Sequence, residues 1–164
     1  MGAQSVIWDR LEFYSITVDD DRINVGGSFE LRYKIRYDYD DVVFDDTKGS
    51  VLGFSWDSVN GWWKKTVTGP SSVTSTNYDE TYVSVIDSTY GLTVKQDVAG
   101  VNVITDRIRI LTLGAVDARI DVGTSATIYA TAELEYDGHP LGAGDSLTIS
   151  GITLSWVAEN SRFE

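Results

Sequence analysis

Aspartates crowd several predicted turns of this chain, and carboxylate oxygens are the ligands that Ca²⁺ prefers in proteins. The densest run is Asp19-Asp20-Asp21, and Asp106 stands at the start of the second copy of a repeated stretch. Ca²⁺ takes about six to eight oxygen ligands, and the sequence has neither EF-hand nor nonapeptide spacing. Because aspartates in turns also accept hydrogen bonds from their own backbone, we expect solvated turns. Ca²⁺ binding by Asp19, Asp20, Asp21 and Asp106 is the alternative, and no other cofactor is expected.

Three aromatic residues, Trp62, Trp63 and Tyr82, could form a surface on which a sugar ring stacks. Grouped exposed aromatic side chains mark contact surfaces. Neighbouring residues on a strand point to opposite faces, so at most one of Trp62 and Trp63 is expected at the surface and the other in the core. A carbohydrate-binding β-sandwich module, with surface glycans as partners, is therefore one alternative function.

The sequence predicts no catalytic residues. His139 is the single histidine and precedes Pro140 in a turn, whereas a catalytic triad or a zinc site needs more partners. Carboxylates are abundant, but no spacing indicates a glycosidase pair. A Lys34–Asn102 isopeptide bond would not be general to the repeat, because Thr131 stands at the Lys34 position of the second copy. We therefore predict that the protein is not an enzyme.

One stretch occurs twice, as residues 9–28 and 106–125, at a constant offset of 97 positions (106 − 9). Each copy holds an Asp-Arg pair, an alternating apolar run, Arg-Ile and Val-Gly-x-Ser. A fixed period in a sequence indicates repeated structural units, so we interpret the shared residues as structural. The repeated structural residues are Asp9, Arg10, Arg22, Gly26, Asp106, Arg107, Arg119 and Gly123.

The Asp-Arg pairs are expected to form ion pairs within their own copies. In the first copy, we expect Asp9-Arg10 to contact Arg22 or Asp20. In the second copy, Arg107 is expected to pair with Asp117. Exposed ion pairs add little stability, so their expected role is in the fold or in the link between copies.

The elements that carry these residues are predicted to be strands. Residues 29–40 alternate apolar with charged side chains, which predicts one buried face and one solvated face. The second copy repeats this alternation over residues 126–137 with the same parity, and a one-residue slip would expose the whole apolar set. Turn signals separate about seven short strands per hundred residues, and the sequence has no sustained helical periodicity. These features predict an all-β fold of antiparallel β-sandwiches.

The composition excludes several classes of partner. The net charge of −12 argues against nucleic acid and against anionic membrane surfaces, which would repel the chain. No apolar run approaches the length of a membrane span, so no membrane insertion is expected. The chain has no cysteines, hence no disulfide framework. Residues 1–5 lack signal-peptide features, so an exported protein is expected to be present here as its mature form or as a fragment.

Four stretches carry a resemblance to a known family: Val-Ile-Trp-Asp-Arg-Leu from Val6, Arg-Ile-Asn-Val-Gly-x-Ser from Arg22, Tyr-x-Tyr-Asp from Tyr37, and Tyr-Gly-Leu-Thr-Val-x-Gln from Tyr90. Their order and spacing resemble the tandem immunoglobulin-like repeats of archaeal, often thermophilic, extracellular surface proteins. The resemblance covers nearly all of residues 8–104 and the available part of residues 105–164. It implies a cell-surface or secreted location and a role as a stalk, spacer or adhesive module. It brings no catalytic residues.

The expected organisation is tandem immunoglobulin-like β-sandwiches with an incomplete second unit. Residues 1–7 correspond to the closing strand of a preceding unit, and residues 8–104 form one complete sandwich. Residues 105–164 form a second repeat that lacks its last strands, which predicts an open edge and an exposed core. The chain is then a fragment, or a partner strand completes the second repeat by strand addition.

We expect a non-enzymatic structural or adhesive module that acts as a spacer or an interaction domain on the cell surface or in a secreted protein. The expected partners are neighbouring immunoglobulin-like units or other copies of the chain, joined by β-strand addition. One alternative is a surface-filament subunit that assembles by strand exchange. The other alternative is the carbohydrate-binding module.

Overall fold

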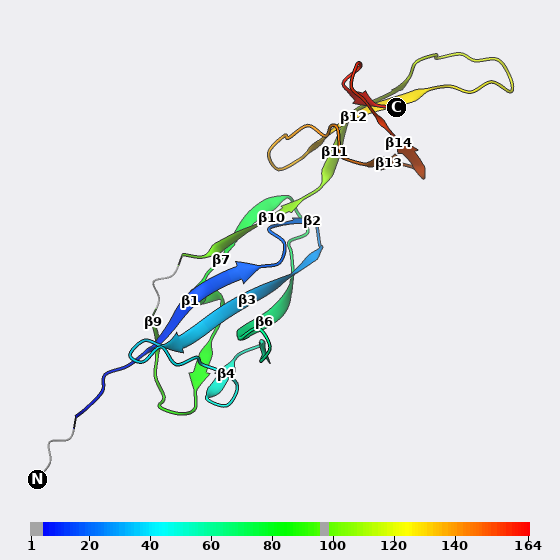
Figure 1. Cartoon of the computed structure of the whole chain (residues 1–164). Coiled ribbons are helices and arrows are strands. Elements are labelled where there is room, and N and C mark those ends of the chain that lie inside the picture. The colour runs from blue at the N-terminus through cyan, green and yellow to red at the C-terminus, as the bar shows by residue number, and fades with distance from the viewer. Residues whose placement is uncertain (1–4, 96–98) are drawn as a thin grey trace, which may run out of the picture. The chain divides into compact units, whose positions relative to one another are not determined.

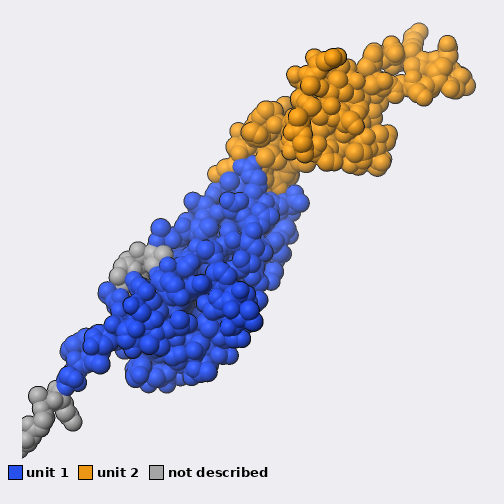
Figure 2. All heavy atoms as spheres, in the orientation of Figure 1, with its two compact units in different colours: residues 1–105 blue, residues 106–164 orange. Residues whose placement is uncertain are grey.

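The computed structural model describes residues 5–95 and 99–164, which form two compact units. Unit 1 is Met1–Thr105 and unit 2 is Asp106–Glu164, coloured blue and orange in Figure 2. Both units consist of β-strands, and unit 1 also holds one turn of 3₁₀ helix, η1 (Glu80–Tyr82). The units divide one residue after the expected boundary of 104/105. The predicted all-β, sandwich-like class is confirmed.

Unit 1 has two main sheets and a two-stranded ladder (Figure 1). In the first sheet β1 is antiparallel to β3 and parallel to β9. This sheet runs β5 (Ser55–Asp57), β6 (Trp62–Thr68), β3 (Ser28–Tyr37), β1 (Leu11–Val18) and β9 (Val94–Lys95). The second sheet runs β2 (Arg22–Asn24), β10 (Val101–Asp106) and β7 (Thr74–Tyr78), and the ladder pairs β4 (Gly49–Val51) with β8 (Val85–Asp87).

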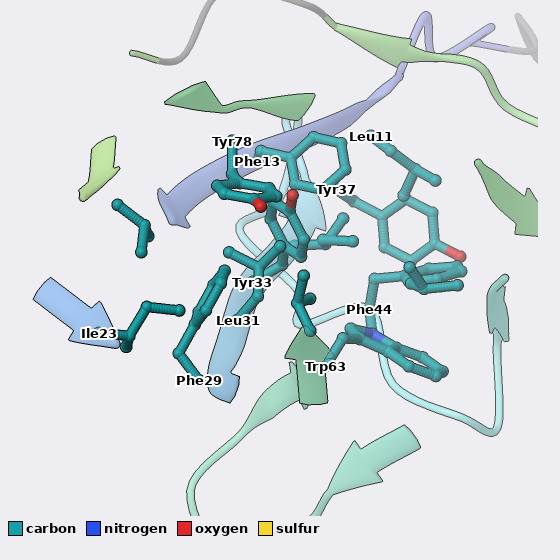
Figure 3. Packing of buried hydrophobic residues seen from close by; sticks show 14 residues of the cluster. Leu11, Phe13, Ile23, Phe29, Leu31, Tyr33, Tyr37, Phe44, Trp63 and Tyr78 are labelled. Carbon is teal, nitrogen blue, oxygen red and sulfur yellow. The ribbon is translucent and has the colours of Figure 1, made fainter. Parts of the chain in front are cut away.

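The core of unit 1 follows from the alternation along β3. Phe29, Leu31, Tyr33, Ile35 and Tyr37 are all buried, while the residues between them are partly exposed, as period-2 alternation predicts. Figure 3 shows the aromatic rings of the core packed together, and several meet edge to face. Such edge-to-face pairs add stability beyond the area they bury.

Unit 2 is smaller. Its main sheet runs β11 (Ile108–Ala115), β12 (Ile128–Leu134), β16 (Arg162–Phe163) and β15 (Trp156–Val157), and a hairpin pairs β13 (Leu147–Ile149) with β14 (Ile152–Leu154). The part of its core under β12 is built from smaller side chains than in unit 1, because Ala130 and Ala132 occupy the places of Tyr33 and Ile35. The buried hydrophobic residues are Ala130, Ala132, Leu141, Leu147, Leu154 and Phe163.

The two units share their strand register at the offset of 97. Leu11 pairs with Tyr37 in β1–β3, and Ile108 pairs with Leu134 in β11–β12. Both ladders shift register at the same place, between Phe13 and Ser15 and between Ile110 and Thr112. The isolated bridges also correspond, Arg36 with Val43 and Glu133 with Pro140. The two units therefore have the same backbone pairing in these ladders, although many of the side chains differ.

The segment before β1 differs from its predicted form. Residues 1–4 of the predicted end strand 1–7 lie outside the described residues, as does the last residue of the motif that begins at Tyr90. Residues 5–8 are described and form no strand; they extend from the start of unit 1 (dark blue in Figure 1). We call residues 5–8 the N-terminal segment.

Candidate interaction site

The Asp-Arg pair of unit 1 joins the start of β1 to the end of β3. The Asp9 carboxylate accepts hydrogen bonds from the backbone N–H groups of Arg10, at 2.7 Å, and Tyr39, at 2.9 Å. The Arg10 guanidinium donates to the Asp38 carboxylate at 2.8 Å. Arg10 therefore pairs with Asp38 rather than with Asp20, whose carboxylate accepts the backbone N–H of Arg22 at 3.0 Å.

Unit 2 repeats this geometry at the offset of 97. The Asp106 carboxylate accepts from the backbone N–H groups of Arg107, at 2.8 Å, and Tyr136, at 2.9 Å. The Arg107 guanidinium donates to Glu135 at 2.7 Å, so its partner is Glu135 and not the predicted Asp117. In both units the aspartate thus joins the start of the first strand to the residues that follow its partner strand.

The turns after β1 and β11 correspond as well. Gly26 and Gly123 have φ of +70° and +87°, a region that glycine enters without steric cost. Arg22 starts β2, whereas its counterpart Arg119 lies outside any strand. The repeated residues thus sit in matching places, but the second sheet that follows Arg22 has no described equivalent in unit 2.

Removing the Asp106 carboxylate tests this structural role. Asp106→Ala is expected to lower the free energy of unfolding of unit 2 by about 2 kcal/mol, because Asp106 is buried and the Tyr136 N–H loses its acceptor. Asp9→Ala, at a partly exposed position, is expected to cost about 1 kcal/mol or less. Hydrogen exchange of β1 and β12 in the intact chain measures both. Equal losses in the two units would contradict a role that depends on burial.

Three of the four acidic residues proposed for Ca²⁺, all but Asp21, accept hydrogen bonds from backbone N–H groups. Asp19 accepts the N–H of Glu30 at 2.7 Å, and Asp20 accepts that of Arg22. Asp106 lies in unit 2 and accepts the two N–H groups described above. Among the described residues, no three or more carboxylates, histidines or cysteines are grouped as metal ligands. We therefore build no Ca²⁺ site on Asp19, Asp20, Asp21 and Asp106.

The aromatic residues proposed for sugar stacking do not form one platform. Trp63 is buried, and its indole N–H donates to the Phe44 carbonyl at 2.9 Å, which removes it from the predicted contact surface. The Lys34 ammonium lies 4.6 Å from the centre of the Trp62 ring, so a cation occupies the ring face. Tyr82 is partly exposed and packs edge to face on Tyr78.

The residues weighed for chemistry have ordinary structural partners. The backbone N–H of His139 donates to the Asp137 carboxylate at 3.1 Å in an exposed turn. Asn102 accepts from Asn77 at 3.1 Å, while Lys34 lies over Trp62, so the two ends of the considered isopeptide bond have separate neighbours. These contacts favour turn and surface roles for all three.

The unusual surface of the molecule is the core-side face of β11. Ile108, Ile110 and Ile120 are 47%, 41% and 48% exposed, whereas their counterparts Leu11, Phe13 and Ile23 are 0%, 1% and 7% exposed. Cross-strand partners share a face, and Ile110 pairs with the buried Ala132, so Ile108 and Ile110 are on the side of β11 that unit 1 buries. Ile120 lies in the loop after β11 and corresponds to the buried Ile23. We call Ile108, Ile110, Leu113 and Ile120 the open face.

The strand that would cover part of the open face is present in unit 1. There β2 lies beside β10, and the Ile104 N–H donates to the Asp21 carbonyl at 2.8 Å. In unit 2 the equivalent of β2, residues 119–121, is not a strand, and no described strand pairs with it. It belongs to the loop 116–127, which projects from β11 and β12 (yellow-green in Figure 1, part of the orange unit in Figure 2).

The N-terminal segment is the second exposed apolar surface. Val6, Ile7 and Trp8 are 76%, 58% and 90% exposed. Ile7 borders a shallow hollow of unit 1 together with Tyr39 and Tyr90. The repeat relates residues 4–8 to residues 101–105 at an offset of 97. Which of these side chains are exposed was not identified from the sequence. The apolar residues that Val6 and Ile7 share with Val103 and Ile104 were the signal that could have identified them.

Comparison of the chain with family models, with curated proteins and with solved structures finds no match in any of the three. Among the described residues, no helix is long and apolar enough to cross a membrane. The functional argument therefore depends on the geometry of the two units and on the sequence repeat.

Proposed function

We propose that the chain is a non-enzymatic structural module of a cell-surface or secreted protein, built from tandem immunoglobulin-like units and acting as a spacer or interaction domain. The observation that carries this proposal is the duplicated geometry. The ladder register, the bulge and the Asp-Arg contacts recur at one offset although the side chains in the two cores differ. Repetition of a whole unit serves distance and surface, because each unit adds length without adding a new site.

The way the chain passes from one unit to the next supports a spacer role. Strand β10 belongs to the second sheet of unit 1 and ends at Asp106, the first residue of unit 2. Asp106 is buried and bonded to Tyr136, so the end of one unit's strand is the anchoring residue of the next. A series of such units needs no separate linker, which suits a stalk.

The surface charge agrees with this proposal. A net charge of −12 favours solubility and opposes adsorption to anionic lipids and nucleic acids. Several arginines are held in ion pairs within their own unit, such as Arg36 with Glu12 and Arg107 with Glu135. The sugar-binding alternative is not developed further, because Trp63 is buried and Trp62 is covered by Lys34.

The location on the cell tests the proposal. Immunogold labelling of intact cells of the source organism, with an antibody raised against this chain, is expected to decorate the cell surface. Permeabilised cells should gain little additional label, and an antibody against a cytoplasmic protein provides the matched control. Label that appears only after permeabilisation would overturn the proposed location and with it the role as a surface spacer.

A further inference from the structure

We propose that the N-terminal segment of one copy of the chain adds as a strand to unit 2 of a second copy, in the place that β10 has in unit 1. The copies would then join head to tail. The inference rests on the repeat relation used for the proposed function. It goes beyond that function by naming the partner, the donor strand and the accepting surface.

The donor has the sequence of a core strand without its burial. Residues 5–8 correspond at the offset of 97 to residues 102–105, and both segments run directly into an Asp-Arg pair. Val103 of β10 is 1% exposed in the unit 1 core, whereas its counterpart Val6 is 76% exposed. A short apolar segment that is exposed to solvent is stabilised when it pairs with a strand edge and its side chains become buried.

The acceptor is the unpaired equivalent of β2. Ala118 corresponds to Asp21, and Ile7 corresponds to Ile104, the donor of the 2.8 Å bond to the Asp21 carbonyl. We therefore expect the Ile7 N–H of one copy to donate to the Ala118 carbonyl of the other. Pairing would convert residues 119–121 into a strand and cover Ile120, as β10 and β2 bury Ile23.

The N-terminal segment differs most from β10 at Trp8, and this difference suits the accepting surface of unit 2. Trp8 stands at the position of Thr105, which lines the space over Gly69 together with Ile23. The counterpart of Ile23 is the exposed Ile120, and the core beside it contains Ala130 and Ala132 where unit 1 has larger residues. A bulky indole is therefore expected to lie on Ile120, where a threonine would leave it uncovered.

Charge and chain continuity favour a second copy of this chain as the occupant. Residues 106–164 contain nine acidic and four basic residues, so an acidic donor strand would be repelled, but residues 1–8 carry no charged side chain. The donor is followed by Asp9-Arg10 just as β10 is followed by Asp106-Arg107. Strand addition thus reproduces a junction that the chain already contains, and a head-to-tail contact that does not close yields a filament.

Engineered cysteines test the predicted register. The chain has no cysteine, so Ile7→Cys with Ala118→Cys can cross-link only through these two positions. Peptide mapping then distinguishes the designed disulfide between positions 7 and 118, whose Cα atoms must lie within about 7 Å, from links between two copies of the same position. Under oxidising conditions we expect a ladder of oligomers on a non-reducing gel that collapses on reduction. The control pairs Ile7→Cys with Val59→Cys, an exposed turn residue of unit 1, and should give about tenfold less ladder. A cross-link confined to monomers, or equal ladders in both proteins, would overturn the proposal.

Uncross-linked chains provide the second test. In sedimentation velocity the wild type is expected to gain mass with concentration. Val6→Asp and Ile120→Asp should each raise the required concentration about tenfold or more, while Ile152→Asp, on the exposed β13–β14 hairpin, should not. All three positions are exposed, so circular dichroism should stay unchanged. Because Val6→Asp keeps the acceptor and Ile120→Asp keeps the donor, their mixture should form dimers that do not extend.

The two proposals fail separately. A wild type that stays monomeric at all concentrations, or assembly that ignores both variants, would sink strand addition and leave a surface location intact. Filaments that form as described, in a protein found only inside cells, would leave strand addition intact and sink the surface role.

Discussion

Replacing Trp63 by alanine is expected to lower the free energy of unfolding of unit 1 by about 4 kcal/mol. The ring is buried and packs against Phe44 and Trp56, with ring centres 6.0 Å and 5.5 Å away. Alanine would leave a cavity of most of an indole and would also remove the donor to the Phe44 carbonyl. Urea unfolding followed by far-ultraviolet circular dichroism measures the loss, with hydrogen exchange of β3 assigning it to unit 1.

Two companion variants separate packing from hydrogen bonding. Trp63→Phe keeps an aromatic ring and loses only the N–H and part of the volume, so a cost of about 1–2 kcal/mol is expected. Phenylalanine is what unit 2 has at this place, Phe163, which pairs with Ala130 as Trp63 pairs with Tyr33. Trp62→Ala, on the opposite face of the same strand, should cost about 1 kcal/mol. A larger cost for Trp62→Ala than for Trp63→Ala would show that the wrong ring had been placed in the core.

The Trp62-Trp63 pair also marks the limit of prediction from sequence. Alternation along a strand establishes that the two rings face opposite ways. It cannot say which one is buried, because β6 begins with two tryptophans, one on each face of the strand. That choice is made by pairing: Trp63 lies opposite Tyr33, whose parity on β3 is unambiguous. Local pattern predicted the elements, and long-range register decided the contents of the core.

The same distinction explains the ion pairs. Sequence reasoning sought partners for Asp9 and Arg10 nearby in the chain and chose Arg22 or Asp20. The structure pairs Arg10 with Asp38 because Leu11 lies opposite Tyr37, which brings the residues flanking these two together. The partner was thus contained in the β1–β3 register. The register could have been proposed from the matched alternation, but the sequence does not fix where a ladder begins.

For unit 2, the repeat predicted an exposed core before any side chain was placed. Whether Ile108, Ile110 and Ile120 would stay uncovered could not be predicted, since a small unit can refold its remaining strands over an exposed face. The structure keeps the inherited register of β11 and β12 and leaves the face open. The loop 116–127 forms no strand, because a strand such as β2 persists only beside a partner such as β10.

The turn after β8, residues 87–91, is anchored by a carboxylate that the sequence does not single out. Asp87 is 7% exposed, and its two oxygens accept hydrogen bonds from the backbone N–H groups of Thr89, Tyr90 and Leu92 and from the Tyr37 hydroxyl. Asp87→Ala is expected to lower the free energy of unfolding of unit 1 by about 3 kcal/mol, because buried donors would lose their acceptor together. Urea unfolding at neutral pH measures this, and Asp40→Ala is the control, because Asp40 lies in an exposed turn and accepts one hydrogen bond, from the Val42 N–H, so that its loss should cost about 1 kcal/mol or less.

The pH dependence of that loss identifies the charged carboxylate as its source. Burial alone would raise the pKa of Asp87, but the three backbone N–H groups and the Tyr37 hydroxyl outweigh burial and hold this pKa below its ordinary value of 3.8. The stabilisation is therefore complete above about pH 4 and is lost as the pH falls through the lowered pKa of the folded state. The difference between wild type and Asp87→Ala should shrink in strong acid. A difference that stays constant down to about pH 2 would contradict a role for the ionised form.

The stability of unit 1 at alkaline pH depends on Tyr37, whose hydroxyl donates to the buried Asp87 carboxylate. Burial, together with the hydrogen bond to the Asp87 carboxylate, raises the pKa of Tyr37 from 10.0 to about 12. A raised folded-state pKa contributes stability that is complete below about pH 10 and is lost as the pH rises through 12. Tyr37→Phe should cost about 1 kcal/mol at neutral pH, and its deficit against the wild type should narrow above about pH 10. Because Asp87→Ala removes the carboxylate that opposes ionisation of this phenol, spectrophotometric titration of that variant should show Tyr37 ionising at lower pH, and an unchanged titration would place the raised pKa in burial alone.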